Sequence, residues 1–202
     1  MKINKILIVL LFPLITEVVI SCCNCLVPLI RYYTNKTVKI QNIDNSGSEP
    51  MITTANTVHK EAFGIRAQLN REKTACLSPF KSLFIQTAYA NGCRCPPSNQ
   101  FLARDSITAI QVFTLNDFDI MHASNSDISD YFKIFQSFSL STITDYIKKY
   151  DKVLYTDNEL ELKFDLLLMT PPTINKNHKF KIKITLSDGR ILEGESTPIE
   201  LI

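Results

Sequence analysis

The chain has 202 residues, which is the length of one domain or of one domain with short additional segments. Hydrophobic residues make up 45% and charged residues 21%, an ordinary globular balance that excludes a mostly disordered chain. The formal net charge is +2, so there is no basic surplus of the kind that indicates nucleic-acid binding.

The N-terminal segment has the pattern of a secretory signal peptide. Two lysines near the start are followed by an apolar stretch over residues 6–20. A permanent membrane span needs roughly 20 apolar residues, whereas this stretch is shorter and contains Pro13 and Glu17. We therefore expect residues 1–21 to be a signal peptide that is removed from the mature protein.

The end of this segment, Val19-Ile20-Ser21-Cys22, resembles the lipobox of bacterial lipoprotein precursors. In such precursors the cysteine thiol is alkylated with diacylglycerol, and a peptidase cleaves before the cysteine. Two or three acyl chains anchor a protein firmly, whereas a single chain holds it only marginally. The resemblance predicts lipidation of Cys22, with residues 22–35 as a tether between the membrane and the domain.

Two features leave alternatives open. The carboxylate of Glu17 departs from the usual pattern, so an ordinary signal peptide or an uncleaved anchor extending through residues 26–30 are the competing interpretations. Cys23 is a rival lipidation site, although it would place Cys22 in the small-residue position. The sequence after Cys22 has no acidic cluster like the surface-export signal of some Bacteroidetes lipoproteins, so we expect an outer-membrane lipoprotein that faces the periplasm.

Three cysteines lie inside the domain: Cys76, Cys93 and Cys95. In an oxidising compartment we expect a disulfide from Cys76 to Cys93 or to Cys95. Closing a loop of about 15–20 residues contributes on the order of 3 kcal/mol. A metal site is the alternative, but structural zinc prefers a wider gap than that between Cys93 and Cys95, and it needs further ligands. We therefore expect no metal and no cofactor.

The first half of the domain is predicted to be β-structure. Apolar residues at every second position in residues 62–70, namely Phe63, Ile65, Ala67 and Leu69, predict a strand with one buried face. Strands are predicted over residues 36–43, 62–70, 82–89 and 106–115. The last is apolar on both faces, which predicts an inner strand that is covered on both sides.

Two short helices are predicted next. The first is predicted because Ile128, Tyr131, Phe132 and Phe135 follow the spacing of one helical face. Ser126 can cap its N-terminus. The second begins near Ser141 or Thr142, and Asp145, three residues after Thr142, resembles a capping box with Asp in place of Glu. The apolar face of this helix is Ile143, Tyr146, Ile147 and Tyr150, and Lys148 and Lys149 suit the negative end of its dipole.

The C-terminal third alternates apolar and polar residues over 159–168 and 179–186. Asp188-Gly189 lies between residues 179–186 and residues 191–195 and is a strong hairpin signal. Residues 198–202 predict a short edge strand. These patterns predict a mainly β protein: one immunoglobulin-like, two-layer β-sandwich over residues 36–202, with one or two short helices. The chain contains no Trp, so the Cys-Trp-Cys hallmark of true immunoglobulin domains is absent.

Several segments carry a resemblance to a known family: Asp44-Asn45-Ser46-Gly47, Lys60-Glu61-Ala62-Phe63-Gly64-Ile65-Arg66, Leu115-Asn116-Asp117-Phe118-Asp119 and residues 180–190. Together they are similar to a family of uncharacterised Bacteroidetes lipoproteins, and the resemblance covers residues 36–202. It implies a cell-envelope location and a β-sandwich fold. It implies no activity and no catalytic residues.

The sequence contains few groups with the spacing of an active site. The histidines, His59, His122 and His178, lie far apart in polar surroundings, which favours solvated loop positions. Asp117, Asp119, Asp127 and Asp130 cluster in one region, and paired carboxylates can serve acid–base chemistry or calcium binding. That region lacks the ligand pattern of a calcium loop, and we expect a solvated acidic loop.

Two functions follow as hypotheses. The first is a non-catalytic, lipid-anchored binding or assembly module whose partner is an envelope protein or a glycan, with Phe101, Phe118 and Tyr131 near an exposed patch. The alternative is an envelope hydrolase or metal-binding protein in which Asp117, Asp119 and His122 converge in one cleft. The row of Lys179, Lys181 and Lys183 is expected to be a solvent face that guards against edge pairing.

Overall fold

The computed structural model describes residues 30–74, 100–136, 138–150 and 161–202. Cys22, the disulfide candidates Cys76, Cys93 and Cys95, and the strand predicted over residues 82–89 lie outside these ranges, so those expectations stay predictions. In the first half the strands are β1 (Ile30–Asp44), β2 (Met51–Ile52), β3 (Thr57–Val58), β4 (Phe63–Thr74), β5 (Gln100–Ala103) and β6 (Ile107–Thr114). In the second half the elements are β7 (Phe132–Gln136), β8 (Ser139–Ser141), α2 (Ile143–Tyr150), β9 (Glu161–Leu168), β10 (Asn177–His178), β11 (Phe180–Leu186), β12 (Ile191–Glu195) and β13 (Ile199–Leu201).

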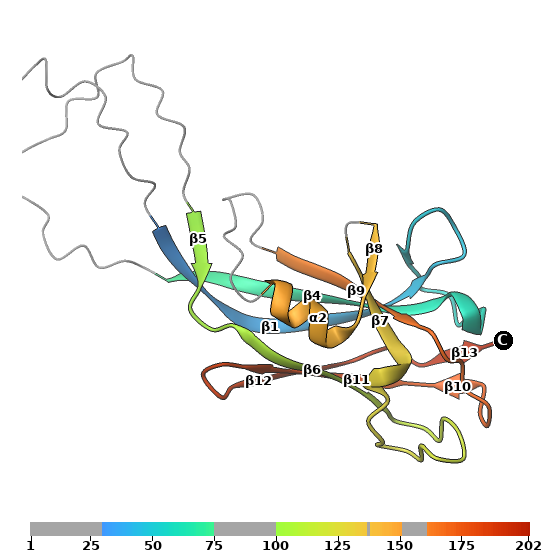
Figure 1. The fold of residues 1–202 in the computed structure, drawn as a ribbon. Helices are drawn as coiled ribbons and strands as arrows, with labels where there is room; N and C mark the ends of the chain where they lie inside the picture. Colours follow the sequence, from blue (N-terminus) through green and yellow to red (C-terminus); the bar gives the residue numbers. More distant parts are fainter. Residues whose placement is uncertain (1–29, 75–99, 137, 151–160) are drawn as a thin grey trace, which may run out of the picture.

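The strands form two layers that face each other (Figure 1). One layer has the strand order β2-β1-β4-β9-β7-β8, with β5 joined to the start of β1. The opposite layer has the order β12-β11-β6, and a short sheet with the order β10-β13-β3 lies at its end.

The strand order of the two layers is that of an immunoglobulin domain. If β1, β4, β6, β7, β9, β11 and β12 are taken as strands A to G in chain order, the first layer reads A-B-E-D and the second reads G-F-C. All the ladders between these strands are antiparallel. This is the arrangement of constant-type immunoglobulin domains. The predicted immunoglobulin-like two-layer sandwich is therefore confirmed.

The core lies between the two layers and follows the alternation of the sequence. Phe63, Ile65, Ala67 and Leu69 of β4 are all fully buried, as the period-two pattern predicts. The β11 residues alternate in the same way between buried and half-buried. Aromatic contacts join the layers, because the Phe180 ring stacks on Phe63 with centroids 5.3 Å apart. Burying one such side chain stabilises the fold by about 1.5–3 kcal/mol.

The position of β6 differs from the prediction of an inner strand. Among the described strands, β6 pairs with β11 alone and forms the edge of its sheet. Its free edge is covered by the chain between residues 125 and 129, where the amides of Asn125 and Ile128 donate to the Thr114 and Val112 carbonyls. The Ser129 hydroxyl in turn accepts from the Val112 amide at 2.9 Å. The irregular segment therefore protects the edge of β6, while only one face of the strand, with Ile110, Val112 and Thr114, is buried and the other is half-buried.

The helix predicted from Ser126 to Phe135 is wrong. Ser129–Tyr131 forms a single 3-10 turn, and Phe132–Gln136 is strand β7, which pairs with β9. Ile134 is fully buried although it lies off the predicted helical face, while Lys133 is exposed. The spacing of Ile128 and Phe132 fits both a helix of period 3.6 and a strand of period two. Pairing with β9 stabilises the strand, so this segment forms β7 rather than a helix.

The helix predicted after Thr142 is confirmed as α2. The N-cap half of the predicted capping box is formed, with the Asp145 amide donating to Thr142 Oγ1 at 3.1 Å, and the Thr142 hydroxyl donates to the Asp145 carboxylate at 2.7 Å. Tyr146 is buried against Phe164, with ring centroids 5.2 Å apart. The helix thereby covers the side of the sandwich next to β6 and β7. No helix among the described residues has the length and hydropathy needed to cross a membrane.

The start of one strand and the position of another within its sheet also differ from the predictions. β1 begins at Ile30, six residues before the predicted start, and contains an irregularity between Asn35 and Thr37 where its register with β4 shifts. The strand predicted at the edge over residues 198–202 is instead the middle strand of its sheet. β13 pairs with β10 on one side and with β3 on the other.

Candidate functional site

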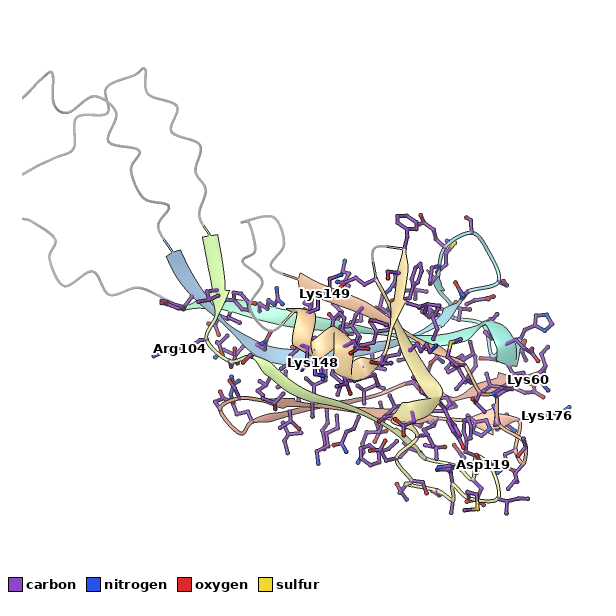
Figure 2. The ribbon with its side chains drawn as sticks, viewed as in Figure 1. Lys60, Arg104, Asp119, Lys148, Lys149 and Lys176 are labelled. Carbon is purple, nitrogen blue, oxygen red and sulfur yellow. The ribbon has the colours of Figure 1, made fainter. Side chains whose placement is uncertain are left out.

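The loop proposed from the sequence as an acid–base or metal site brings only part of that site together. Asp119 and His122 are adjacent, with Asp119 Oδ1 2.8 Å from His122 Nδ1. The same carboxylate oxygen accepts hydrogen bonds from the amides of Met121 and His122 at 2.8 Å. Asp117 is exposed and accepts a separate bond from the Ser124 amide at 2.9 Å. Figure 2 labels Asp119 at the end of the sandwich away from β5.

The Asp119 carboxylate acts as the organising group of this loop. Desolvation raises the pKa of Asp119, but the hydrogen bonds from His122 and from two backbone amides outweigh it, so the pKa of Asp119 is lowered. Desolvation, together with the Asp119 charge, raises the pKa of the Tyr131 phenol. Among the residues that the structure describes, no three His, Cys, Asp or Glu side chains gather as a metal ion would require.

The predicted exposure of two other residues is wrong. His178 is buried, with its ring 5.5 Å from that of Phe118 and 5.8 Å from that of Phe180, and its Nε2 is 2.8 Å from the Asn175 carbonyl. Phe118 is fully buried and belongs to the core rather than to an exposed patch. Tyr131 is half-buried, and the Phe101 side chain lies outside the described part of the structure.

Lys181 and Lys183 lie on the outer face of β11, Lys179 directly precedes this strand, and all three residues are half-buried. Lys179 forms an ion pair with Glu195 of β12, and the Lys181 ammonium lies 5.7 Å from the centre of the Phe113 ring. These contacts are typical of a solvated sheet face. They do not form a concave site.

A groove that the sequence did not predict lies on the outer face of the other layer. Its floor is a bidentate ion pair between Arg66 of β4 and Asp165 of β9, with Nε–Oδ1 and Nη2–Oδ2 distances of 2.7 and 2.6 Å. The side chains are 22% and 9% exposed. Arg66 Nη2 also donates to the Pro50 carbonyl at 3.1 Å, which holds the loop after β1 against the floor. Such fork-to-fork pairs fix a guanidinium in one orientation.

Two segments that rise from this face form the walls of the groove: the loop between β1 and β2, and the hairpin of β7 and β8 (Figure 1). The groove has a volume of about 310 Å³, which is within the range of small-ligand sites. The groove is lined by residues that include Glu49, Pro50, Arg66, Phe135, Gln136, Phe138, Lys163 and Asp165.

Phe138, in the turn between β7 and β8, is the most unusual residue of the groove. Its side chain is 81% exposed, and its backbone φ angle is 62°, in the left-handed region. Tight hairpin turns normally use Gly, Asn or Asp at such positions. The Phe138 ring meets the Phe135 ring edge-on, with centroids 6.5 Å apart. An exposed aromatic ring thus lines a groove whose floor is polar.

Gln136 belongs to the lining of the groove and has one unsatisfied polar atom. Its Nε2 donates to the Lys163 carbonyl at 3.3 Å, whereas its Oε1 is buried and has no hydrogen-bond partner among the described residues. Because this oxygen is buried, it is not exposed to a ligand in the groove.

Sequence patterns could not reveal this groove. Arg66 alternates with the buried residues of β4 and so falls on the opposite face, but nothing in the sequence pairs it with Asp165, 99 residues away. The one local signal is Phe138 directly before a short strand, in a turn where a large aromatic residue is uncommon.

A second, much smaller cavity is lined by Asp105 and its polar neighbours. Its volume of about 20 Å³ can hold no more than about one water molecule.

Comparisons with known proteins give a family but no activity. The family described as Domain of unknown function (DUF5034) matches residues 35–197. Among solved structures, the C-terminal domain of the Streptococcus pyogenes antigen I/II-family protein AspA is similar at 10% identity and a TM-score of 0.27, covering 82% of this chain and 46% of that one. A chain described as BspA_C_mut is similar at 6% identity and a TM-score of 0.24, covering 81% of this chain and 46% of that one.

The chain therefore spans about half the length of these two solved structures. No curated protein matches it.

Proposed function

The chain belongs to the DUF5034 family, whose function is unknown, and we propose that it is a lipid-anchored cell-envelope protein that acts as a non-catalytic binding module. In this proposal Cys22 carries the lipid, and the domain lies on the periplasmic side of the outer membrane of a Bacteroidetes-type cell. The groove over Arg66 and Asp165 receives the partner.

The observation that carries the binding proposal is Phe138. A bulky residue with a positive φ angle costs on the order of 1–3 kcal/mol, and its ring is left 81% exposed instead of contributing to the core. Such a residue contributes little to stability in the free protein. Its position beside a concave polar floor supports a role in contacting a partner.

The anchor proposal is supported by the lipobox-like residues before Cys22 and by where the domain starts. Ile30, the first residue of β1, is the eighth residue after Cys22. A fully extended chain of that length reaches roughly 30 Å at most. A lipid on Cys22 would therefore keep the sandwich within about one domain diameter of the membrane.

The anchor is tested by metabolic labelling with a palmitate analogue, comparing the wild type with Cys22→Ser in fractionated membranes. We expect label in the wild type and none in the variant. Label in neither protein, or equal label in both, would contradict the anchor at Cys22.

The groove is tested separately by placing the photo-crosslinking residue p-benzoylphenylalanine at position 138 in cells. The matched control carries it at position 121, because Met121 is 83% exposed and lies on a loop remote in the sequence from the groove. We expect a defined adduct, protein or glycan, from position 138 and none from position 121. Equal adducts from both positions, or none from position 138, would contradict binding in the groove.

A further inference from the structure

We infer that the groove over Arg66 and Asp165 binds a sugar ring of a neutral oligosaccharide, with Phe138 against one face of the ring. This inference rests on the proposed use of the groove for binding, and it specifies the chemistry of the ligand. It follows from the charge of the lining, from the hydrogen-bonding groups left open on the floor, and from the aromatic wall.

The charges of the lining favour a neutral ligand. Arg66 and Lys163 are cationic, Glu49 and Asp165 are anionic, and their formal charges sum to zero. The Arg66 charge is matched by the Asp165 carboxylate at 2.6 Å. A phosphate or a polyanion would meet two carboxylates here, whereas a neutral polar ligand meets no repulsion.

The floor offers an open donor group. Arg66 uses its Nε and Nη2 for Asp165 and Pro50, and its Nη1, with two N–H donors, has no hydrogen-bond partner among the described residues. A sugar hydroxyl accepts hydrogen bonds, so neighbouring ring hydroxyls satisfy both of these donors.

The place of the floor within the sheet disfavours an extended peptide. Arg66 and Asp165 face each other across the ladder between β4 and β9, which lie inside the sheet. Backbone groups there are already used in the ladder, so a peptide cannot add as a further strand. Recognition depends on side chains alone, which suits a compact ring with outward hydroxyls.

The aromatic wall complements the apolar face of a sugar ring. The face of an aromatic ring carries negative potential and attracts polarised C–H groups. Phe138 is 81% exposed, and its ring meets the Phe135 ring edge-on. The backbone strain at Phe138 is then explained, because a typical turn residue such as Asn would relax the backbone but remove the wall.

Calorimetric titration tests the inference, using the lipidated full chain in a detergent without a sugar head group. The probes are maltotetraose, cellotetraose, mannotetraose and chitotetraose, with inorganic phosphate and an unrelated hexapeptide as comparisons. We expect at least one tetrasaccharide to bind, and phosphate and the peptide not to bind. Phe138→Asn, which keeps a turn-compatible residue, should weaken binding about tenfold or more.

The matched control Met121→Ala should leave sugar binding within about twofold of the wild type. Binding of phosphate or the peptide with no tetrasaccharide bound, binding of none of the probes, or equal sugar affinity in Phe138→Asn would overturn the inference. A position-specific crosslink at residue 138 together with no sugar binding would leave the groove as a binding site and reject only the saccharide. Absence of both the crosslink at residue 138 and sugar binding would reject the groove as a binding site.

Discussion

The guanidinium of Arg190 forms an ion pair with the carboxylate of Asp105, whose side chain is only 2% exposed. The same carboxylate accepts from the Thr34 hydroxyl at 2.8 Å and from the Asn35 backbone amide at 3.1 Å. Asp105 thus joins the start of β1, the chain before β6 and the hairpin of β11 and β12, which are 70 and 85 residues away in the sequence. One buried side chain fastens both layers at this end of the sandwich.

Removing this carboxylate should destabilise the whole domain. Asp105→Ala leaves the Asn35 amide without its acceptor, so we expect the free energy of unfolding to fall by about 2 kcal/mol in urea titrations. Asp188→Ala is the control, because it removes the exposed second partner of the same Arg190 guanidinium, 2.7 Å from its Nε. Its effect should be within about 0.5 kcal/mol. Equal losses in both variants would contradict the role of Asp105.

Gly64 should not tolerate a side chain. A Cβ atom there would lie 2.9 Å from the Leu166 carbonyl oxygen, the Ile43 side chain and the Leu167 side chain, and the carbonyl belongs to the paired strand β9. Gly64→Ala should therefore lower the unfolding free energy by about 2 kcal/mol. At Gly47 the nearest atom is 3.9 Å away, and Gly47→Ala should leave the thermal midpoint nearly unchanged. An unchanged midpoint for Gly64→Ala would show that β4 and β9 can separate at no cost.

Phe138 should be replaceable with a gain in stability. Asn adopts the left-handed conformation at less cost than Phe, and little buried area is lost because the ring is exposed. Phe138→Asn should raise the unfolding free energy by up to about 1 kcal/mol. Thermal denaturation of the two proteins measures this directly. A clear fall in stability would mean that the ring packs in the free protein and would weaken its assignment to a ligand.

The buried His178 should make stability depend on pH. Burial lowers the pKa of His178 below its usual value of 6.5, although the bond to the Asn175 carbonyl opposes this. Below pH 6.5, His178 therefore binds a proton more readily in the unfolded chain than in the folded domain. The contribution of neutral His178 to the free energy of unfolding is fully present above that pH and decreases as the pH falls below it. The wild type should lose more stability than His178→Gln between about pH 7.5 and 5.

The exposed His59 provides the control for this pH dependence. His59→Gln should show the same decrease in the free energy of unfolding as the wild type over that pH range, measured by urea titration. Identical pH profiles for all three proteins would exclude His178 as the source.

Local sequence signals account well for the individual strands and for one helix. The alternation in β11 and the Asp188-Gly189 turn, with Gly189 at a φ angle of 85°, follow from short-range stereochemistry. The Thr142 capping box likewise depends on residues three positions apart. Each of these features needs no knowledge of distant strands, so the sequence alone is enough to predict it.

Features that depend on distant neighbours were missed. The segment from Ile128 to Phe135 has apolar residues that suit a helix, and only the open place beside β9 makes part of it a strand. His178 has polar neighbours in the sequence but aromatic neighbours in space. The groove depends on Arg66 and Asp165, which the sequence separates by 99 residues. No local pattern records which strands become adjacent.

The insertion of β9 between β4 and β7 has a consequence for how the chain folds. β4 can pair with β1 early, but its other edge stays open until β9 is available much later in the chain. Pairings of such large sequence separation form slowly, because loop-closure entropy must be paid first. In the meantime, the alternating apolar residues of β4 present an unpaired strand edge, the kind of surface at which chains associate wrongly. The docking of β9 closes that edge and brings Asp165 to Arg66, so the floor of the groove forms only when this long-range pairing is made.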